Sequence, residues 1–291
     1  MKAYVFPGQG AQFTGMGKDL YDNNETAKEL FEKANEILGF RITDIMFEGT
    51  ADELKQTKVT QPAVFLHSVI RAICLGDEFE PAMVAGHSLG EFSALVAAGA
   101  LSFEDGLKLV YARALAMQKA CEAAPSTMAA VIGLDDKTIE DICAEITAEG
   151  NGVVVAANYN CTGQLVISGN IEAVNAACDK LKAAGAKKAV ILPVSAPFHS
   201  TLMKPAAEKL AVELDKVTLS DARIPVVANV NAQVLTKAED IKASLVAQAA
   251  SPVLWEDCVA KMKEFGADVL LEAGPGKTLC GFNRRIDKSI K

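Results

Sequence analysis

The pentapeptide at 86–90 reads Gly-His-Ser-Leu-Gly and places a serine between two glycines. The apolar run 83–85 before it predicts a short buried strand, and the apolar spacing after it predicts a helix. A strand, a G-x-S-x-G sequence and a helix in this order are typical of a nucleophile elbow, in which the serine hydroxyl stands at the tip of a sharp turn. We therefore predict Ser88 as a nucleophile, and we expect the backbone N–H of Leu89 to face a developing oxyanion. An ordinary glycine-rich turn with an exposed serine is the alternative.

The three histidines of the chain are the candidates for the base that a serine hydroxyl requires at neutral pH. His67 lies in a densely apolar segment, which favours a position in the core or on a helix surface. His87 directly precedes Ser88 and should leave the turn in another direction, so we expect it to brace the turn. His199 is therefore the candidate base. The alternative for His199 is a loop histidine without chemistry.

Arg113 lies among apolar and small side chains in the segment 109–117. Most helical arginines are solvated, and that is the first interpretation. The second is a guanidinium buried in a pocket, where it would bind a carboxylate through two parallel hydrogen bonds. The neighbouring sequence offers no obvious acidic partner, so the carboxylate could belong to a substrate.

Two glycine-containing segments suggest nucleotide binding, but neither has the required spacing. A dinucleotide fingerprint beginning at Gly8 would need a glycine at Phe13. A phosphate loop ending at 276–278 would need a glycine at Leu271. We therefore expect no nucleotide cofactor, although the turn 8–10 can serve as a backbone donor loop beside Ser88.

The composition predicts a folded cytoplasmic protein. The chain has 291 residues, of which 50% are hydrophobic and 23% are charged, so it can bury a large core. No apolar run approaches the ~20 residues of a membrane helix, and we expect no signal peptide in the first seven residues, because the segment is short and soon followed by glycine. The seven cysteines contain no C-x-x-C pair, which favours reduced thiols over a disulfide framework or a zinc site. The net charge of −8 argues against binding to nucleic acid.

The first 125 residues alternate between strand and helix patterns. We predict a strand over 3–6, and helices over 25–38, 61–75 and 103–124, with Thr60 as the N-cap of the second helix and Pro62 in its first turn. Such alternation indicates an α/β layer structure with a largely parallel sheet.

The pattern changes near residue 126. We predict strands over 128–132, 153–157, 164–168 and 188–192, and helices over 136–149 and 171–184. This βαββαβ order is that of a ferredoxin-like unit. Residues 126–194 are therefore predicted as an inserted small domain, and 1–125 with 195–291 as the α/β domain. The later elements are predicted as strands over 226–229 and 269–272, helices over 240–249 and 255–265, and a closing helix after Gly276.

Eight short segments together resemble one family, the malonyl-CoA:acyl carrier protein transacylases, which load malonyl units for fatty-acid synthesis. They occur in family order and cover nearly the whole chain. The segments are 6–10 (FPGQG), 60–63 (TQPA), 86–91 (GHSLGE), 111–113 (YAR), 158–160 (NYN), 198–200 (FHS), 251–253 (SPV) and 272–276 (EAGPG).

The resemblance implies a hydrolase-like α/β domain with a ferredoxin-like insertion. It implies Ser88 as the nucleophile and His199 as the base. It also implies that the backbone N–H groups of Gln9 and Leu89 form the oxyanion hole and that Arg113 binds the free carboxylate of the malonyl group.

The resemblance implies further roles around these residues. The main-chain carbonyl of Gln248 would support the histidine in place of a triad aspartate, and Gln61 and Asn158 would contact the substrate. Phe198 precedes the histidine, as in related polyketide acyltransferases that prefer malonyl over methylmalonyl groups. The resemblance implies no metal and no redox cofactor. The partners would be malonyl-CoA and acyl carrier protein, with neither nucleic acid nor membrane.

The expected reaction is a ping-pong acyl transfer through a malonyl-serine intermediate. A serine thioesterase or esterase is the first alternative, because it would use the same elbow and histidine. A stand-alone acyltransferase that serves a polyketide synthase and a non-catalytic binding module are two others. Carrier proteins are commonly acidic, so a local basic patch would have to overcome the negative charge of this chain. Lys187, Lys188, Arg284 and Arg285 are the candidates for that patch.

Overall fold

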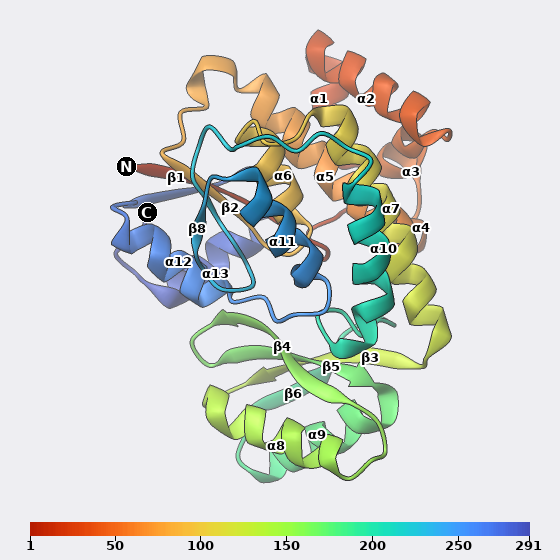
Figure 1. Ribbon diagram of the computed structural model, residues 1–291, viewed down its shortest axis with the longest axis vertical. Coiled ribbons are helices and arrows are strands. Elements are labelled where there is room, and N and C mark those ends of the chain that lie inside the picture. Colours follow the sequence, from red (N-terminus) through yellow and green to blue (C-terminus); the bar gives the residue numbers. More distant parts are fainter.

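A computed structural model describes residues 1–291 (Figure 1). A larger unit of helices around a central sheet lies above a smaller unit, in which two helices cover one side of a second sheet. The two ends of the chain lie close together in the larger unit. No helix combines the length and the apolar character needed to cross a membrane.

The central sheet has five strands in the order β8-β7-β2-β1-β9. Neighbouring strands are parallel except for β8, which is antiparallel to β7. The predicted, largely parallel sheet is therefore confirmed. The strands are β1 Lys2–Phe6, β2 Met83–Gly86, β7 Val226–Val227, β8 Val234–Leu235 and β9 Val269–Glu272.

Helices cover both faces of the central sheet because successive side chains of each strand point to opposite sides. Tyr4 and Phe6 of β1 belong to the larger apolar cluster, on the side of α5 Thr57–Cys74, α6 Gly90–Ala97 and α7 Phe103–Ala123. Ala3 and Val5 belong to a second cluster, on the side of α12 Trp255–Glu264 and α13 Thr278–Ile286. The two cores fix the sheet, so the carboxyl ends of β1 and β2 come together at one edge.

The smaller sheet is antiparallel, with the strand order β4-β5-β3-β6. Its elements follow one another as strand, helix, strand, strand, helix, strand. One face packs against both helices, and Met128, Ala157 and Val166 on the other side join an apolar cluster with Phe198 and Met117 of the larger unit. The elements are β3 Ser126–Ile132, α8 Asp136–Ala148, β4 Val154–Cys161, β5 Gln164–Asn170, α9 Ile171–Ala183 and β6 Lys188–Ile191.

The start of α5 corrects one prediction. The helix predicted over 61–75 begins at Thr57, with Gln56 in the N-cap position, so Thr60 is not its cap. The hydroxyl of Thr60 donates to the carbonyl of Gln56 at 3.0 Å, a bond from a side chain back to the preceding turn. Pro62 therefore lies inside the helix rather than in its first turn.

The predicted helix over 25–38 is present with the same ends as α2 Glu25–Leu38. Several other elements were not predicted. The other predicted elements are present, and most of their ends differ by one to four residues. The additional elements are α1 Lys18–Asn23, α3 Ile42–Glu48, α4 Ala51–Lys55, η1 Gly76–Glu78, η2 Thr201–Met203, α10 Lys204–Leu214 and the short strand β8. The helix predicted over 240–249 is α11 Ala238–Gln248.

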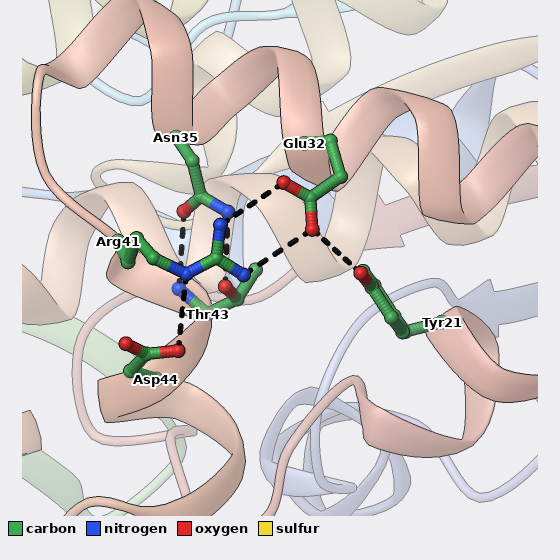
Figure 2. Close-up of polar contacts among 6 residues, drawn as sticks. All are labelled: Tyr21, Glu32, Asn35, Arg41, Thr43 and Asp44. Carbon is green, nitrogen blue, oxygen red and sulfur yellow. Dashed lines mark hydrogen bonds and ion pairs between the residues drawn. The ribbon is translucent and has the colours of Figure 1, made fainter.

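A polar network joins α1, α2 and α3 (Figure 2). Glu32 of α2 accepts hydrogen bonds from the hydroxyl of Tyr21 at 2.5 Å and from Arg41 at 3.1 and 3.3 Å. One turn further along α2, Asn35 donates to the hydroxyl of Thr43 at 2.9 Å. The pair of Glu32 and Arg41 is solvent-exposed and adds little to stability, whereas Asn35 and Thr43 are buried.

Candidate active site

Ser88 lies in the turn between β2 and α6 and has a backbone φ of 55°. A Cβ at Gly86 would lie 1.9 Å from the carbonyl carbon of Gly90. A Cβ at Gly90 would lie 2.1 Å from the carbonyl oxygen of Phe6. Both glycines are therefore required by close backbone approach, and the serine is left in a left-handed conformation that is rare for non-glycine residues.

The side chain of Asn229 holds this turn from the neighbouring strand. Its Oδ1 accepts from the backbone N–H of Ser88 at 2.7 Å, and its Nδ2 donates to the carbonyl of Gly86 at 2.6 Å. Asn229 is fully buried just after β7, which pairs with β2. One amide thus satisfies the backbone on both sides of the turn.

His199 brings its imidazole to Ser88 from a distant part of the chain. Its Nε2 lies 2.8 Å from Oγ of Ser88. Its Nδ1 lies 3.0 Å from the carbonyl oxygen of Gln248 and 3.1 Å from that of Ser251. Because carbonyl oxygens only accept, Nδ1 carries the proton, and Nε2 is free to accept from the serine hydroxyl.

The environment of His199 keeps the imidazole neutral. Burial and then the positive charge of Arg113 lower the pKa of His199 to about 3, against the effect of its carbonyl contacts. Its backbone φ is 59°, so both members of the serine–histidine pair occupy the left-handed region. Conformations of this kind persist where the surrounding structure fixes them.

Arg113 is buried beside the same hydroxyl, with 1% of its surface exposed. It donates from NH2 to Ser88 Oγ at 3.1 Å and to Gln248 Oε1 at 2.9 Å, and from NH1 to Gln61 Oε1 at 2.8 Å. The ring of Phe92 lies 5.5 Å from the guanidinium carbon. The three hydrogen bonds go to uncharged oxygens, and Nε has no partner. The arginine therefore retains capacity to bind a carboxylate.

Two backbone amides beside Ser88 have no hydrogen-bond partner within the protein. They are the N–H groups of Gln9, in the turn after β1, and of Leu89, at the start of α6. Both residues line the same cavity as Ser88. The Gln9 side chain donates from Nε2 to Thr57 Oγ1 at 3.4 Å.

A cavity of about 1140 Å³ lies between the larger unit and the smaller sheet. Ser88, His199 and Arg113 line its floor, and residues of β3, β4, β5 and the segment after β6 line its other wall. Asn158 lies on that wall with an unpaired, buried Oδ1. The cavity is much larger than a malonyl group needs, so it has room for a longer substrate arm.

The other two histidines lie away from the reacting hydroxyl. Nε2 of His87 lies 2.8 Å from Oδ1 of Asn160, and its ring packs against Trp255 at a centroid distance of 5.7 Å. His67 is buried in α5 with Nδ1 unpaired, and burial lowers its pKa to about 4. Of the three histidines, His199 is the one that hydrogen-bonds to Ser88 Oγ.

Two residues of the site carry contacts that the sequence did not indicate. Asn229 was placed at the end of a strand without a role. Glu91 appeared only as part of the 86–91 segment, but its side chain is 2% exposed and accepts a hydrogen bond from Gln248. A signal for Glu91 was its position among apolar residues in the first turn of a buried helix.

Comparison with known proteins defines the class. The model of the Acyl transferase domain family matches residues 3–285. The chain is 45% identical over 294 residues to a malonyl CoA-acyl carrier protein transacylase of Bacillus subtilis (strain 168), which covers 99% of this chain and 91% of that protein. This chain therefore belongs to the acyl transferase family. A second curated relative, from Escherichia coli (strain K12), is also a malonyl CoA-acyl carrier protein transacylase and is 46% identical over 286 residues, which cover 98% of this chain and 92% of that protein.

Solved structures agree with this assignment. An acyl-carrier-protein S-malonyltransferase from Burkholderia pseudomallei 1710b has a TM-score of 0.95 and 43% identity, over 99% of this chain and 94% of that chain. A malonyl-transacylase in complex with its type II PKS acyl-carrier protein also has a TM-score of 0.95, at 41% identity, over 99% of this chain and 93% of that chain.

Proposed function

We propose that this protein transfers a malonyl group from malonyl-CoA to the phosphopantetheine thiol of an acyl carrier protein, through a malonyl ester of Ser88, in fatty-acid biosynthesis. The observation that carries the proposal is the double contact at one oxygen. Ser88 Oγ touches a neutral imidazole at 2.8 Å and a buried guanidinium at 3.1 Å. The imidazole can take the hydroxyl proton, as acyl transfer to serine requires, and the guanidinium can bind the carboxylate of an acyl group attached to this oxygen.

In the first half-reaction, His199 Nε2 takes the hydroxyl proton while Ser88 Oγ attacks the thioester carbonyl. The unpaired N–H groups of Gln9 and Leu89 stabilise the oxyanion of the tetrahedral intermediate. The carbon–sulfur bond then breaks, and the imidazolium returns its proton to the sulfur of CoA. The products are free CoA and the malonyl ester of Ser88.

In the second half-reaction, the thiol of the carrier protein enters the cavity. His199 takes the thiol proton, the sulfur attacks the ester carbonyl, and the oxygen of Ser88 leaves and regains the proton. The carbonyls of Gln248 and Ser251 stabilise the imidazolium in both halves, in the place of a carboxylate. They also fix the ring orientation.

The guanidinium of Arg113 binds the malonyl carboxylate beside the reacting carbonyl. Gln61 holds NH1 in place, and Nε remains free for the substrate. Asn158, with its unpaired amide oxygen on the cavity wall, is assigned to the substrate arm. Acetyl groups lack the carboxylate and would leave the buried cation unpaired, which disfavours them.

We infer that residues 126–194 form a ferredoxin-like inserted domain and that 1–125 with 195–291 form the hydrolase-like catalytic domain. The strand order β4-β5-β3-β6 with two helices on one face supports this division. The face of the inserted sheet opposite α8 and α9 contributes one wall of the cavity, where it would keep water from the acyl-serine. We place the enzyme in the cytoplasm, where its seven unpaired cysteines would stay reduced.

We assign the contact with the acidic carrier protein to a basic surface that joins one end of the inserted sheet to α13 of the catalytic domain. Arg285 donates to Oε1 of Gln164 at 2.7 Å, and Gln164 pairs across the sheet with Ile132, which pairs with Lys188. Lys188 thus lies at the same end of the smaller sheet as Gln164, the residue that Arg285 of α13 contacts, and Lys187 and Arg284 are exposed chain neighbours of the two cations. Charge reversal at these four positions should weaken carrier-protein turnover and reduce its dependence on salt.

The proposal is tested with radiolabelled malonyl-, methylmalonyl- and acetyl-CoA, each with and without phosphopantetheine-bearing carrier protein. We expect malonyl label on the enzyme without carrier protein and on the carrier thiol with it. Rapid hydrolysis of malonyl-CoA without carrier protein would instead identify a thioesterase. Carrier proteins of fatty-acid and polyketide synthesis are both needed, because one solved relative is bound to a type II PKS acyl-carrier protein.

A further inference from the structure

Glu91 is a buried carboxyl group that the proposed reaction does not use. It lies in the first turn of α6, three residues after Ser88, and 2% of its surface is exposed. Its Oε2 accepts a hydrogen bond from Nε2 of Gln248. Burial raises the pKa of Glu91 to about 7, while the Gln248 bond and the positive charge of Arg113 favour its ionised form. A carboxylate is costly in such a place unless it is compensated.

The side chain of Gln248 separates this carboxylate from the buried cation. Its Nε2 donates to the carbonyl of Ser88 at 2.8 Å as well as to Glu91, and Oδ1 of Asn229 lies 3.4 Å away. Three acceptors surround this atom, so it must be the nitrogen of the amide. The oxygen of the amide therefore faces Arg113, where it accepts from NH2 at 2.9 Å.

We propose that Glu91 is the counter-charge of Arg113 and that it positions the guanidinium through the Gln248 amide for an incoming carboxylate. The amide dipole has its oxygen towards the cation and its nitrogen towards the anion, so the three groups stabilise one another. Burial lowers the pKa of Arg113 to about 10, and it does so against the negative charge of Glu91, which favours the protonated guanidinium. Glu91 thus offsets part of the cost of burying Arg113.

The indirect arrangement matters for substrate binding. A carboxylate in direct contact would occupy the fork of the guanidinium and compete with the substrate. Glu91 lies one amide away, so it compensates the charge of Arg113 while Nε stays unpaired. Glu91 is therefore a positioning residue that favours acyl groups with a carboxylate. This last step rests on the proposed malonyl transfer, whereas the link between Glu91 and Arg113 does not.

The link is tested by a double-mutant cycle on the thermal midpoint of unfolding, with Glu91→Gln, Arg113→Met and the double variant of the full chain. We expect the Glu91→Gln substitution to be more favourable in the Arg113→Met background than in the wild type, by about 2–4 °C. Equal shifts in both backgrounds would overturn the link. If Glu91→Gln does not fold in the wild-type background, a double variant more stable than Arg113→Met supports the link and one that is not overturns it.

The role in selectivity is tested by single-turnover acylation of Ser88. Glu91→Gln should lower kcat/KM for malonyl-CoA about tenfold and leave that for acetyl-CoA close to the wild-type value. An equal loss for both substrates, or no loss, would overturn the positioning role. Glu272→Gln is the matched control, because burial also raises the pKa of Glu272 to about 7 but its bond goes to the backbone of Leu279. A wild-type enzyme that takes up no malonyl group would contradict the proposed function, but the unfolding cycle would still decide the link.

Discussion

Arg113 donates a hydrogen bond of 3.1 Å to Oγ of Ser88, the atom proposed to carry the acyl group. The cation is therefore adjacent to the reacting centre before any substrate arrives. An acyl group on Ser88 with a carboxylate one carbon beyond its carbonyl would place that carboxylate near the same guanidinium. The group proposed to select the acyl group, Arg113, and the group proposed to catalyse its transfer, His199, thus both contact the same oxygen of Ser88.

Replacing Arg113 should separate selectivity from catalysis. Arg113→Ala removes a charged hydrogen-bond donor from the malonyl carboxylate, a loss of about 1.5–3 kcal/mol, or roughly 10- to 150-fold in kcat/KM for malonyl-CoA. The acylation rate with acetyl-CoA should change much less. Measuring kcat/KM for both substrates in one assay checks this prediction. An equal decrease in kcat/KM for both would show that Arg113 does not bind the substrate carboxylate.

Asn229 should affect all acyl groups alike. Asn229→Ala leaves the N–H of Ser88 and the carbonyl of Gly86 without their partner, so the elbow loses its fixed geometry. We expect kcat for both malonyl- and acetyl-CoA to fall about 10- to 100-fold. Asn231→Ala is the control, because its side chain is exposed and bonds only near its own turn. A variant with selective loss of malonyl transfer would contradict this assignment.

The oxyanion donor of Gln9 can be tested through its neighbour Gly8. A Cβ at Gly8 would lie 2.5 Å from the carbonyl oxygen of His87, so Gly8→Ala must displace the turn that carries the Gln9 N–H. The acylation rate should fall by about 10²-fold, in line with the loss of one oxyanion-hole donor. Gly281→Ala meets no atom within 4 Å and should leave the rate unchanged. Full activity of Gly8→Ala, with its thermal midpoint intact, would exclude this donor.

His67 should make stability depend on pH. The pKa of this histidine is lowered to about 4 by burial first and by the nearby charge of Arg71 next, against a smaller opposite effect of Asp19. The unfolded chain therefore takes up a proton near pH 6.5 that the folded chain binds only near pH 4, and stability is lost as the pH falls between these values. His67→Leu removes this loss.

Denaturant unfolding of wild type and His67→Leu at several pH values measures the effect. The stability of the variant relative to the wild type should increase by about 1–3 kcal/mol as the pH falls from 6.5 to 4. A constant difference over this range would show that His67 titrates normally in the folded protein.

Local patterns were sufficient to predict the main elements and to select Ser88 and His199 as candidates, which the structure places 2.8 Å apart. The glycines around Ser88 and the apolar segments on either side predicted a turn with close backbone approach. Such a turn depends only on residues that are neighbours in the sequence. The helix over 25–38 was predicted with its correct ends because its apolar face repeats locally, and the structure adds Asn24 as its N-cap and Gly39 as its C-cap. The roles of Ser88, His199 and Arg113 remain proposals that their geometry supports.

Long-range contacts were not predictable from the sequence alone. Asn229 and Ser88 are 141 positions apart, and no periodicity links a strand end to a turn so distant in the chain. The burial of Glu91 depends on how α6 packs, so its segment alone did not assign it a role. The predicted start of α5 was wrong. Thr60 is a good capping residue, but in the structure its hydroxyl lies inside the helix and donates to the carbonyl of Gln56, four residues earlier.

The most direct test of the account is the site and nature of the acyl-enzyme. The enzyme is mixed with malonyl-CoA without carrier protein, quenched in acid, and the modified peptide is mapped by mass spectrometry beside the Ser88→Ala variant. The account predicts one malonyl group per wild-type chain, attached to Ser88, released to carrier protein on its addition, and absent from the variant. A malonyl group on another residue, or transfer to carrier protein by Ser88→Ala at the wild-type rate, would contradict it.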